Sequence, residues 1–205
     1  LLDKLQRQAC AAPLYEGIQQ YGSMRAQEQG RALYLMYHGR LVRQKGVDVL
    51  LKAIHRILED APNLRFIVMG QGNPELESEA IALAAALPGT FVYCKGYNRK
   101  AARLITAAAD FIVLPSLFEQ CGLEDLIAQV YGTIPIANAQ GGLQKIINGQ
   151  TGSLYALPRG EEQNTDLHIS ALTETILNQA AHFFTSGKAT LTDIPYFSAI
   201  ILRAC

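Results

Sequence analysis

The feature that most constrains the fold is a regular alternation of short apolar runs with longer segments of helical spacing. The short runs have the length and content of buried strands and span residues 32–37, 64–69, 91–94, 111–114, 134–137 and 153–155. The segments in which apolar residues recur every three or four positions span 47–58, 73–87, 98–109, 123–131 and 165–184. Strands joined through helices run parallel, with right-handed crossovers. The sequence therefore predicts an α/β fold with an open, doubly wound parallel sheet and helices on both faces.

The chain length of 205 residues suits one domain with at most a small appendage. Residues 1–30 are polar and mixed, and we interpret them as a linker or an edge helix. Residues 31–160 contain the alternation and form the predicted ligand-binding domain. Residues 161–205 add a C-terminal helical segment to the same domain, although residues 185–205 are ambiguous. The first residue is not Met, so we expect a fragment or a processed piece.

Composition excludes several classes of function. Lys plus Arg and Asp plus Glu each total 18, so the formal net charge is zero, and a nucleic-acid partner is disfavoured. No apolar run is long enough to span a bilayer, so no membrane association is expected. The four cysteines are scattered, which argues against a disulfide scaffold or a zinc site and favours a reducing, cytoplasmic location.

The ends of the predicted strands are the places to look for a site, because ligands of doubly wound sheets bind outside the carboxyl ends of the strands. Arg40 and Lys45 lie in the loop after the first of these strands, just before a helix. A guanidinium and an ammonium beside free helix amides are suited to a diphosphate. The alternative is that Lys45 is solvated or pairs with Asp48.

The loops after the next two strands are glycine-rich. Gly70-Gln71-Gly72 permits a close approach of the backbone to a ligand, but a dinucleotide fingerprint needs a third glycine three positions on, where Glu75 stands. NAD binding is therefore disfavoured, and the alternative is a tight turn that only packs. Tyr97 follows Gly96 and could stack on a nucleobase, or simply pack.

Glu119 is the candidate for chemistry. It follows the strand at 111–114 and is flanked by Phe118 and Cys121, so it is partly desolvated unless a ligand hydroxyl or a cation meets it. It could hold sugar hydroxyls or stabilise positive charge at an anomeric carbon, or it could simply cap the following helix. Cys121 has no histidine in its loop and is better read as a small thiol than as a nucleophile.

Gly141 and Gly142 open a short helix after the strand at 134–137. Their amides could donate to a phosphate or a sugar oxygen. The alternative is a loop that needs a positive φ angle.

Taken in order, these stretches resemble the C-terminal half of bacterial glycogen synthases and plant starch synthases, from about residue 37 to residue 157. The motifs that carry the resemblance are Gly-Arg-Leu-x-x-Gln-Lys-Gly (39–46), Gly-x-Gly-Asn-Pro (70–74), Gly-Tyr (96–97), Ala-Asp-Phe-x-x-x-Pro-Ser-x-Phe-Glu-x-Cys-Gly-Leu (109–123), Tyr-Gly-Thr-x-Pro (131–135) and Gly-Gly-Leu (141–143). The resemblance implies one Rossmann-like half of a GT-B glycosyltransferase. Such enzymes act with retention on ADP-glucose or UDP-glucose and extend an α-1,4-glucan, with no metal and no cofactor.

The resemblance also implies roles for individual residues. Arg40 and Lys45 would hold the donor diphosphate, Tyr97 would lie against the base, and Glu119 would meet the glucose hydroxyls near the reacting carbon. The remaining predicted substrate-binding residues lie in the glycine-containing loops: Gly72, Cys121, Gly122, Leu123, Gly141 and Gly142. The amides around the last four positions would serve the distal phosphate and the sugar.

Some residues depart from the pattern of that family. Leu117 stands where an Arg is usual, and Gln120 where a Pro is usual. Glu124 and Asp125 follow Cys-Gly-Leu in place of a neutral pair, and two carboxylates beside a phosphate site would weaken anion binding. The second Glu of related transferases is Ile127 here.

The resemblance covers only the donor-binding half. In these enzymes an N-terminal domain holds the α-glucan acceptor, and it is absent from these residues, so we expect this chain alone to transfer nothing. A second hypothesis is a non-catalytic nucleotide-binding or assembly module that keeps the fold. A third is a GT-B enzyme that transfers another sugar.

Overall fold

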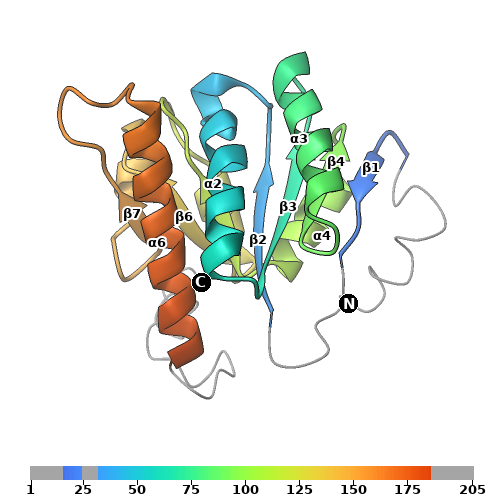
Figure 1. Cartoon of the computed structure of the whole chain (residues 1–205). Helices are drawn as coiled ribbons and strands as arrows, with labels where there is room; N and C mark the ends of the chain where they lie inside the picture. Colours follow the sequence, from blue (N-terminus) through green and yellow to red (C-terminus); the bar gives the residue numbers. More distant parts are fainter. Residues whose placement is uncertain (1–15, 25–31, 186–205) are drawn as a thin grey trace.

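A computed structural model describes residues 16–24 and 32–185 of the chain, which form a sheet flanked by helices (Figure 1). The strands are β1 (Gln19–Gly22), β2 (Leu33–His38), β3 (Leu64–Gly70), β4 (Phe91–Lys95), β5 (Phe111–Leu114), β6 (Ile134–Asn138) and β7 (Ser153–Tyr155). The helices are η1 (Arg43–Lys45), α2 (Val47–Asp60), α3 (Pro74–Ala86), α4 (Arg99–Ala108), α5 (Glu124–Val130), η2 (Gly141–Lys145) and α6 (Thr165–Thr185). The two η elements are short 3₁₀ helices.

The sheet has the strand order β1-β4-β3-β2-β5-β6-β7, and the six strands from β2 to β7 are parallel. From β2 the chain first moves outward through β3 and β4, then returns to the other side of β2 with β5, β6 and β7. The order therefore reverses between β2 and β5, the switch point at which such sheets gather ligands. The predicted doubly wound α/β fold is confirmed.

The first strand corrects the prediction for residues 1–30. Residues Gln19–Gly22 form an antiparallel edge strand on β4, not a linker or a helix, so the sheet is mixed. The segment carries a single large apolar side chain, Tyr21, which stacks on Tyr93 with ring centroids 5.9 Å apart. An edge strand with one such anchor lacks the apolar run by which the other strands were predicted. Residues 1–15 and 25–30 of the predicted segment lie outside the described ranges.

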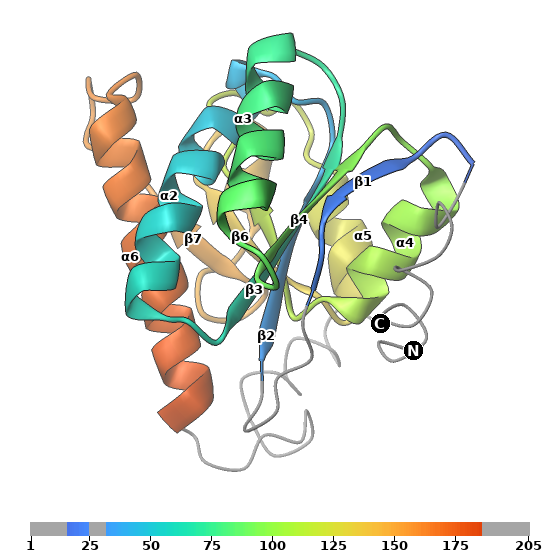
Figure 2. The same ribbon diagram turned by 45° about the vertical axis from the view of Figure 1, so that its right-hand side comes forward.

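Helices cover both faces of the sheet. Figure 1 shows α6, α2 and α3 in front of it, and Figure 2 shows α4 and α5 on the opposite side. Because side chains alternate along a strand, Leu33, Leu35 and Tyr37 of β2 enter the core beneath α2 and α6, whereas Met36 enters the smaller core on the other face. Both faces of β2 are thus buried, which explains its continuous apolar sequence.

Two asparagines fix the starts of helices on opposite faces. The Asn73 side chain accepts hydrogen bonds from the amides of Glu75 and Leu76, and Pro74 occupies the first turn of α3. The Asn98 side chain accepts from the amides of Lys100 and Ala101 at the start of α4. Asn is a favoured N-cap, and proline at the first helical position loses no hydrogen bond, so both helices begin where their sequences favour it.

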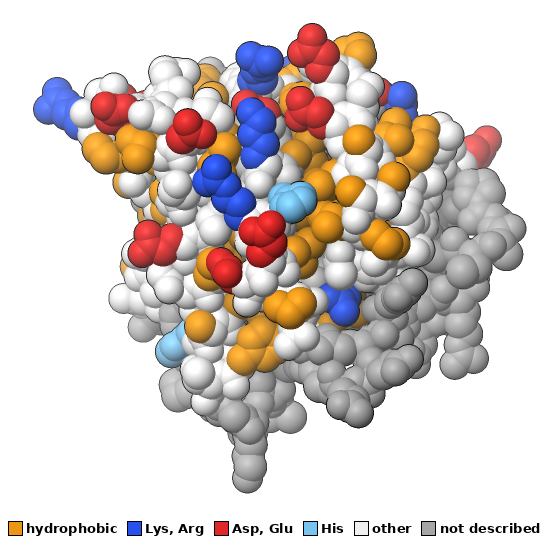
Figure 3. All heavy atoms as spheres, in the orientation of Figure 1, with side chains coloured by type: hydrophobic (Ala, Val, Ile, Leu, Met, Phe, Trp, Pro, Cys, Tyr) orange, Lys and Arg blue, Asp and Glu red, His pale blue; other side chains and the backbone are white. Residues whose placement is uncertain are grey.

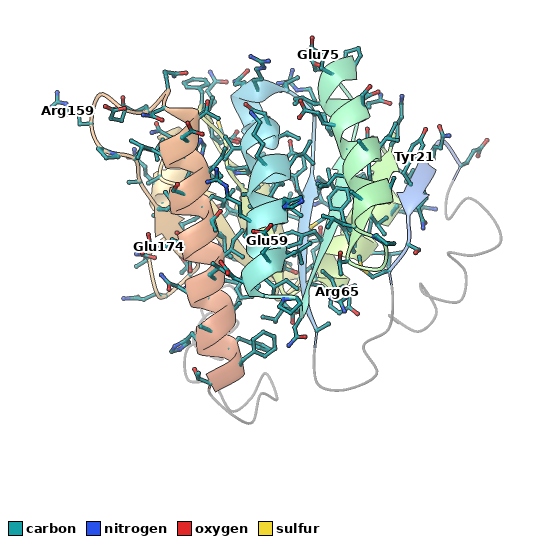
Figure 4. The ribbon with its side chains drawn as sticks, viewed as in Figure 1. Tyr21, Glu59, Arg65, Glu75, Arg159 and Glu174 are labelled. Atoms are coloured by element: carbon teal, nitrogen blue, oxygen red, sulfur yellow. The ribbon has the colours of Figure 1, made fainter. Side chains whose placement is uncertain are left out.

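The outer surface of the front helices is polar and carries charges of both signs among scattered apolar side chains (Figure 3). Glu59 of α2 and Glu174 of α6 point away from the sheet, and Glu75 marks the start of α3 at the carboxyl end of the sheet (Figure 4). Within the described ranges, no helix has both the length and the apolar content that a membrane span needs.

Helix α6 is joined to β7 by a buried polar contact. The Tyr155 hydroxyl lies 2.7 Å from His168 Nε2, and His168 is 1% exposed. Burial lowers the pKa of the imidazole to about 4, against an opposing effect of Asp48. The folded state therefore resists protonation of this side chain, while the unfolded chain takes up the proton near its ordinary pKa of about 6.5.

We expect this difference in pKa to make stability fall on acidification. Below pH 6.5 the unfolded state binds a proton that the folded state does not, so the free energy of unfolding should drop by ~2 kcal/mol between pH 7.5 and pH 5. His168→Gln should flatten this dependence, measured by urea denaturation at several pH values. His55→Gln is the control, since His55 is exposed on α2. An equally steep profile for His168→Gln would contradict the assignment.

Gly46 joins η1 to α2 at a close approach of two loops. Its φ angle is +66°, and a Cβ placed there would lie 2.0 Å from the carbonyl oxygen of Pro115. Gly132 has a similar φ of +82°, but no atom lies within 4 Å of its Cβ position. The two glycines share the left-handed backbone and differ in the space beside it.

Alanine substitution at Gly46 and at Gly132 should separate the cost of a left-handed backbone from the cost of the close contact with Pro115. Gly132→Ala should lower the free energy of unfolding by about 1 kcal/mol, from the left-handed backbone alone. Gly46→Ala should cost ~1–3 kcal/mol more, because the Pro115 loop must move. Urea denaturation of both variants measures the difference, and equal losses would show that the Pro115 contact imposes no constraint.

Candidate functional site

A cavity of about 410 Å³ lies outside the carboxyl ends of the strands, where the loops after β2, β3, β4 and β5 meet. Its lining residues come from separate parts of the chain: Tyr37, His38, Gly39, Arg40, Lys45, Gly70, Gln71, Tyr97, Leu114, Ser116, Glu119, Gly122, Leu123, Glu124 and Leu143. Six of the predicted site residues are therefore brought together: Arg40, Lys45, Tyr97, Glu119, Gly122 and Leu123.

The central contact of the cavity is an ion pair. Lys45 Nζ donates to Glu119 Oε2 at 2.5 Å, and the two side chains are 24% and 19% exposed. The Ser116 hydroxyl lies 3.4 Å from the same carboxylate oxygen. Lys45 thus pairs with Glu119 and not with Asp48. A partly desolvated carboxylate was expected to need a cation or a ligand hydroxyl, and Lys45 is that cation.

Hydrogen bonds to main-chain carbonyls hold the loops that carry this pair. The amide of Leu117 donates to the carbonyl of Gln44 at 2.9 Å, which ties the loop after β5 to η1. The Asn138 side chain, at the end of β6, donates to the carbonyl of Ser116 at 3.0 Å. Lys45 and Glu119 are 74 residues apart in sequence, and these main-chain contacts are what bring them face to face.

Arg40 and Tyr97 stand at the cavity with their side chains available. Arg40 is exposed and forms no ion pair with any residue of the described ranges. Its carbonyl accepts a hydrogen bond from the Tyr37 hydroxyl at 2.8 Å, and burial raises the pKa of Tyr37, which keeps the hydroxyl protonated as a donor. Tyr97 is 54% exposed, so its ring is available for stacking on a planar group.

Four predicted residues do not line the cavity: Gly72, Cys121, Gly141 and Gly142. The Gly72 amide donates to Glu77 Oε1 at 2.7 Å, and the Gly142 amide donates to the carbonyl of Glu119 at 2.9 Å. Both amides are therefore bonded within the chain. The glycines serve close packing instead, since a Cβ on Gly142 would lie 2.2 Å from the Cys121 carbonyl oxygen.

The amides of Gly122 and Leu123, in contrast, donate no hydrogen bond to the described part of the chain. Both residues line the cavity. Gly122 has a φ angle of +63°, so the chain turns there in a left-handed conformation that suits glycine. Two unused amides at the wall of a cavity are available to an anion or to a sugar oxygen.

The sequence analysis missed a charged cluster at one end of the cavity. His38 Nε2 lies 3.0 Å from Glu124 Oε2, and Arg103 Nη1 lies 3.2 Å from the same oxygen. The hydrogen bond with His38 and the charge of Arg103 hold the pKa of Glu124 below its usual range. His38 directly precedes Gly39-Arg40 at the end of β2, and that position is the signal that could have identified it.

Asp125 differs from its neighbour Glu124. It was expected beside a phosphate site, but its side chain is fully buried, lies outside the cavity lining, and faces Lys145, whose Nζ is 3.1 Å from Oδ1. Only one of the two acidic residues therefore faces the cavity, and a cation contacts each of them. The expected repulsion of an anion is reduced accordingly.

The arrangement suits a ligand that carries both negative charge and hydroxyl groups. Arg40 and Lys45 supply cationic donors, Glu119 and Glu124 supply acceptors, and Tyr97 supplies an exposed ring. Within the described residues, no three His, Cys, Asp or Glu side chains converge in the manner of metal ligands. What the cavity offers a ligand is therefore charge, hydrogen bonds and an aromatic face.

Comparison with known proteins bears on the family. Residues 32–187 match the family model described as glycosyl transferases group 1. The chain is 43% identical over 110 residues to the glycogen synthase of Leptospira biflexa, covering 54% of this chain and 23% of that protein. It is 35% identical over 150 residues to the glycogen synthase of Pseudomonas aeruginosa, covering 73% and 28%.

A plant relative and a solved structure extend the comparison. The granule-bound starch synthase 1 of Arabidopsis thaliana is 41% identical over 115 residues, covering 56% of this chain and 18% of that protein. The catalytic domain of starch synthase IV from Arabidopsis thaliana, bound to ADP and acarbose, superposes with a TM-score of 0.68 at 24% identity, covering 86% of this chain and 36% of that one. This last likeness supports the fold.

The chain spans about a quarter of the length of the glycogen synthases that it matches. The match to the family model, in contrast, covers most of the chain and includes every loop of the cavity. The chain belongs to the group 1 glycosyltransferases, and within that family it is similar to the glycogen and starch synthases.

Proposed function

We propose that this chain is the donor-binding domain of a retaining glucosyltransferase that extends an α-1,4-glucan from ADP-glucose or UDP-glucose. The observation that carries the proposal is the convergence of Arg40, Lys45 and Glu119 on one cavity at the switch point of the sheet. A cationic pair beside a carboxylate fits a glycosyl diphosphate, which presents two phosphates and a ring of hydroxyls. The similarity to glycogen and starch synthases supports the same substrate class.

The residues then have distinct roles. Arg40 and Lys45 bind the diphosphate and stabilise the charge that develops on it as it leaves. Glu119 accepts hydrogen bonds from the glucose hydroxyls and stabilises positive charge at the reacting carbon. Tyr97 stacks on the base. The free amides of Gly122 and Leu123 donate to the distal phosphate or to the sugar.

The acceptor lies beyond this chain in our proposal. An α-glucan would be held by an N-terminal domain of the longer protein, so the chain alone binds the donor and transfers nothing. We place the protein in the cytoplasm, because its four scattered cysteines favour a reducing compartment. A non-catalytic module that keeps the fold is the second candidate, and Leu117, which replaces a cationic residue beside Phe118-Glu119, favours it.

Calorimetric titration of the chain with ADP and with UDP tests the donor assignment. Arg40→Ala and Lys45→Ala should each weaken binding by about 10- to 100-fold, because each removes a charge-assisted hydrogen bond of ~1.5–3 kcal/mol. Arg159→Ala is the matched control, since Arg159 is an exposed cation on the loop before α6 (Figure 4). Absence of binding, or binding that none of the three variants changes, would favour the non-catalytic module.

Glu119→Gln tests how the ion pair takes part in binding. The variant frees Lys45 from its carboxylate, so we expect free ADP to bind about 2- to 10-fold more tightly, the equivalent of ~0.4–1.4 kcal/mol. The affinity for ADP-glucose should gain less or fall, because the carboxylate that accepts the glucose hydroxyls is lost. Titration with both ligands measures the two effects, and equal weakening of both would refute this role for Glu119.

A further inference from the structure

The Lys145 ammonium connects three segments behind the cavity. It donates to the carbonyl of Cys121 at 2.8 Å, to the carbonyl of Gly122, and to the carbonyl of Gly142 at 3.0 Å. It also lies 3.1 Å from Asp125 Oδ1. One cation at the end of η2 therefore contacts the loop after β5, its own 3₁₀ turn and the first turn of α5. Lys145 itself does not line the cavity.

The Lys145 ammonium also faces a buried carboxylate, that of Asp125. Asp125 is 0% exposed. Among the residues that the structure describes, Lys145 is the only cation within ion-pair distance of the Asp125 carboxylate. Burial raises the pKa of Asp125, and the ammonium acts against that rise. A buried carboxylate without a cation is costly, so Asp125 holds the Lys145 ammonium at this place.

The loop whose carbonyls Lys145 contacts also contributes residues to the cavity lining, namely Glu119, Gly122 and Leu123. The Gly142 amide donates to the Glu119 carbonyl at 2.9 Å, and a Cβ on Gly141 would lie 1.9 Å from that same oxygen. The first residues of η2 thus contact the main chain of Glu119. At its other end, Lys145 donates hydrogen bonds to the carbonyls of Cys121 and Gly122. The loop 119–122 has little freedom while both ends are held.

We propose that Lys145 is a positioning residue: through the carbonyls of Cys121 and Gly122 it fixes the loop that presents the Glu119 carboxylate and the Gly122 and Leu123 amides to the donor. This inference rests on the proposed function for the identity of the ligand, but the ordering of the loop does not depend on it. The competing explanation is that Lys145 only neutralises Asp125. The two explanations differ in what happens when both charges are removed.

A double-mutant comparison separates them. Lys145→Met should lower the melting temperature and weaken ADP binding, because it strands the buried Asp125 and releases the loop. Asp125→Asn combined with Lys145→Met removes the stranded charge, so the melting temperature should return most of the way to that of the original chain. ADP affinity should stay about tenfold weaker in the double variant, because the loop carbonyls still lack their donor.

The outcome that overturns the proposal is recovery of both properties in the double variant. In that case Lys145 acts as a counter-ion and nothing more. If Lys145→Met alone does not fold, the double variant and Asp125→Asn still give the comparison, since Asp125→Asn keeps the ammonium on the loop and should bind ADP within about threefold of the original chain.

Hydrogen exchange followed by mass spectrometry supplies a measurement that needs no ligand. In the double variant, the peptide covering residues 141–145 should exchange faster, because the Gly142 amide loses its steady bond to the Glu119 carbonyl, while peptides of β2 and β3 keep their protection. Unchanged exchange in the 141–145 peptide would overturn the positioning role. If the original chain binds neither ADP nor UDP, the donor assignment fails, and hydrogen exchange alone then decides whether Lys145 orders the loop.

Discussion

The contact on which the site depends is the ion pair between Lys45 and Glu119. It joins the loop after β2 to the loop after β5, and these two strands are neighbours only because the order of the sheet reverses between them. The backbone contacts between Leu117 and Gln44, and between Gly46 and Pro115, set the spacing of the two loops. The ion pair is therefore a consequence of topology: parallel strands bring their carboxyl ends to one edge, and the charged loops that follow must meet there.

The second constraint is local compensation of charge. The chain has no net charge, yet carboxylates and cations are concentrated at one edge of the sheet. Glu124 is held by His38 and Arg103, and Asp125 by Lys145. These two acidic residues, which depart from the glycogen synthase pattern, therefore do not act as bare negative charges beside the cavity. A carboxylate whose oxygen already faces two basic groups repels an incoming anion less than a free one.

The sequence predicted the parallel strands and the helices between them because burial on both faces leaves continuous apolar runs, which are local signals. It missed β1 because a short edge strand needs only one anchor, Tyr21. It predicted Arg40, Lys45 and Glu119 together because strand ends in this topology share an edge. It did not predict that the amides of Gly72 and Gly142 would be used internally, since a glycine in a sequence does not reveal where its N–H points.

The residues that were missed share a cause. His38 and Lys145 act through partners distant in sequence, 86 positions away for Glu124 and 20 for Asp125, which are the simple differences of their residue numbers. From the sequence alone, His38 is equally well interpreted as a packed histidine and Lys145 as a solvated lysine. Only their placement at the end of β2 and at the end of η2 shows that they support the wall of the cavity. Pairings of this kind depend on tertiary structure and leave no periodicity to read.

Two kinds of contact surround the cavity, and the difference between them bears on specificity. The backbone hydrogen bonds among the loops cannot be exchanged for a ligand unless the chain moves. The Lys45–Glu119 pair can be exchanged by side-chain rotation alone. A plain diphosphate that takes Lys45 leaves a mostly buried carboxylate without its cation, which is costly. A glycosyl diphosphate supplies an anion for the ammonium and hydroxyls for the carboxylate in one molecule. The Lys45–Glu119 pair therefore favours a ligand that satisfies both of its members.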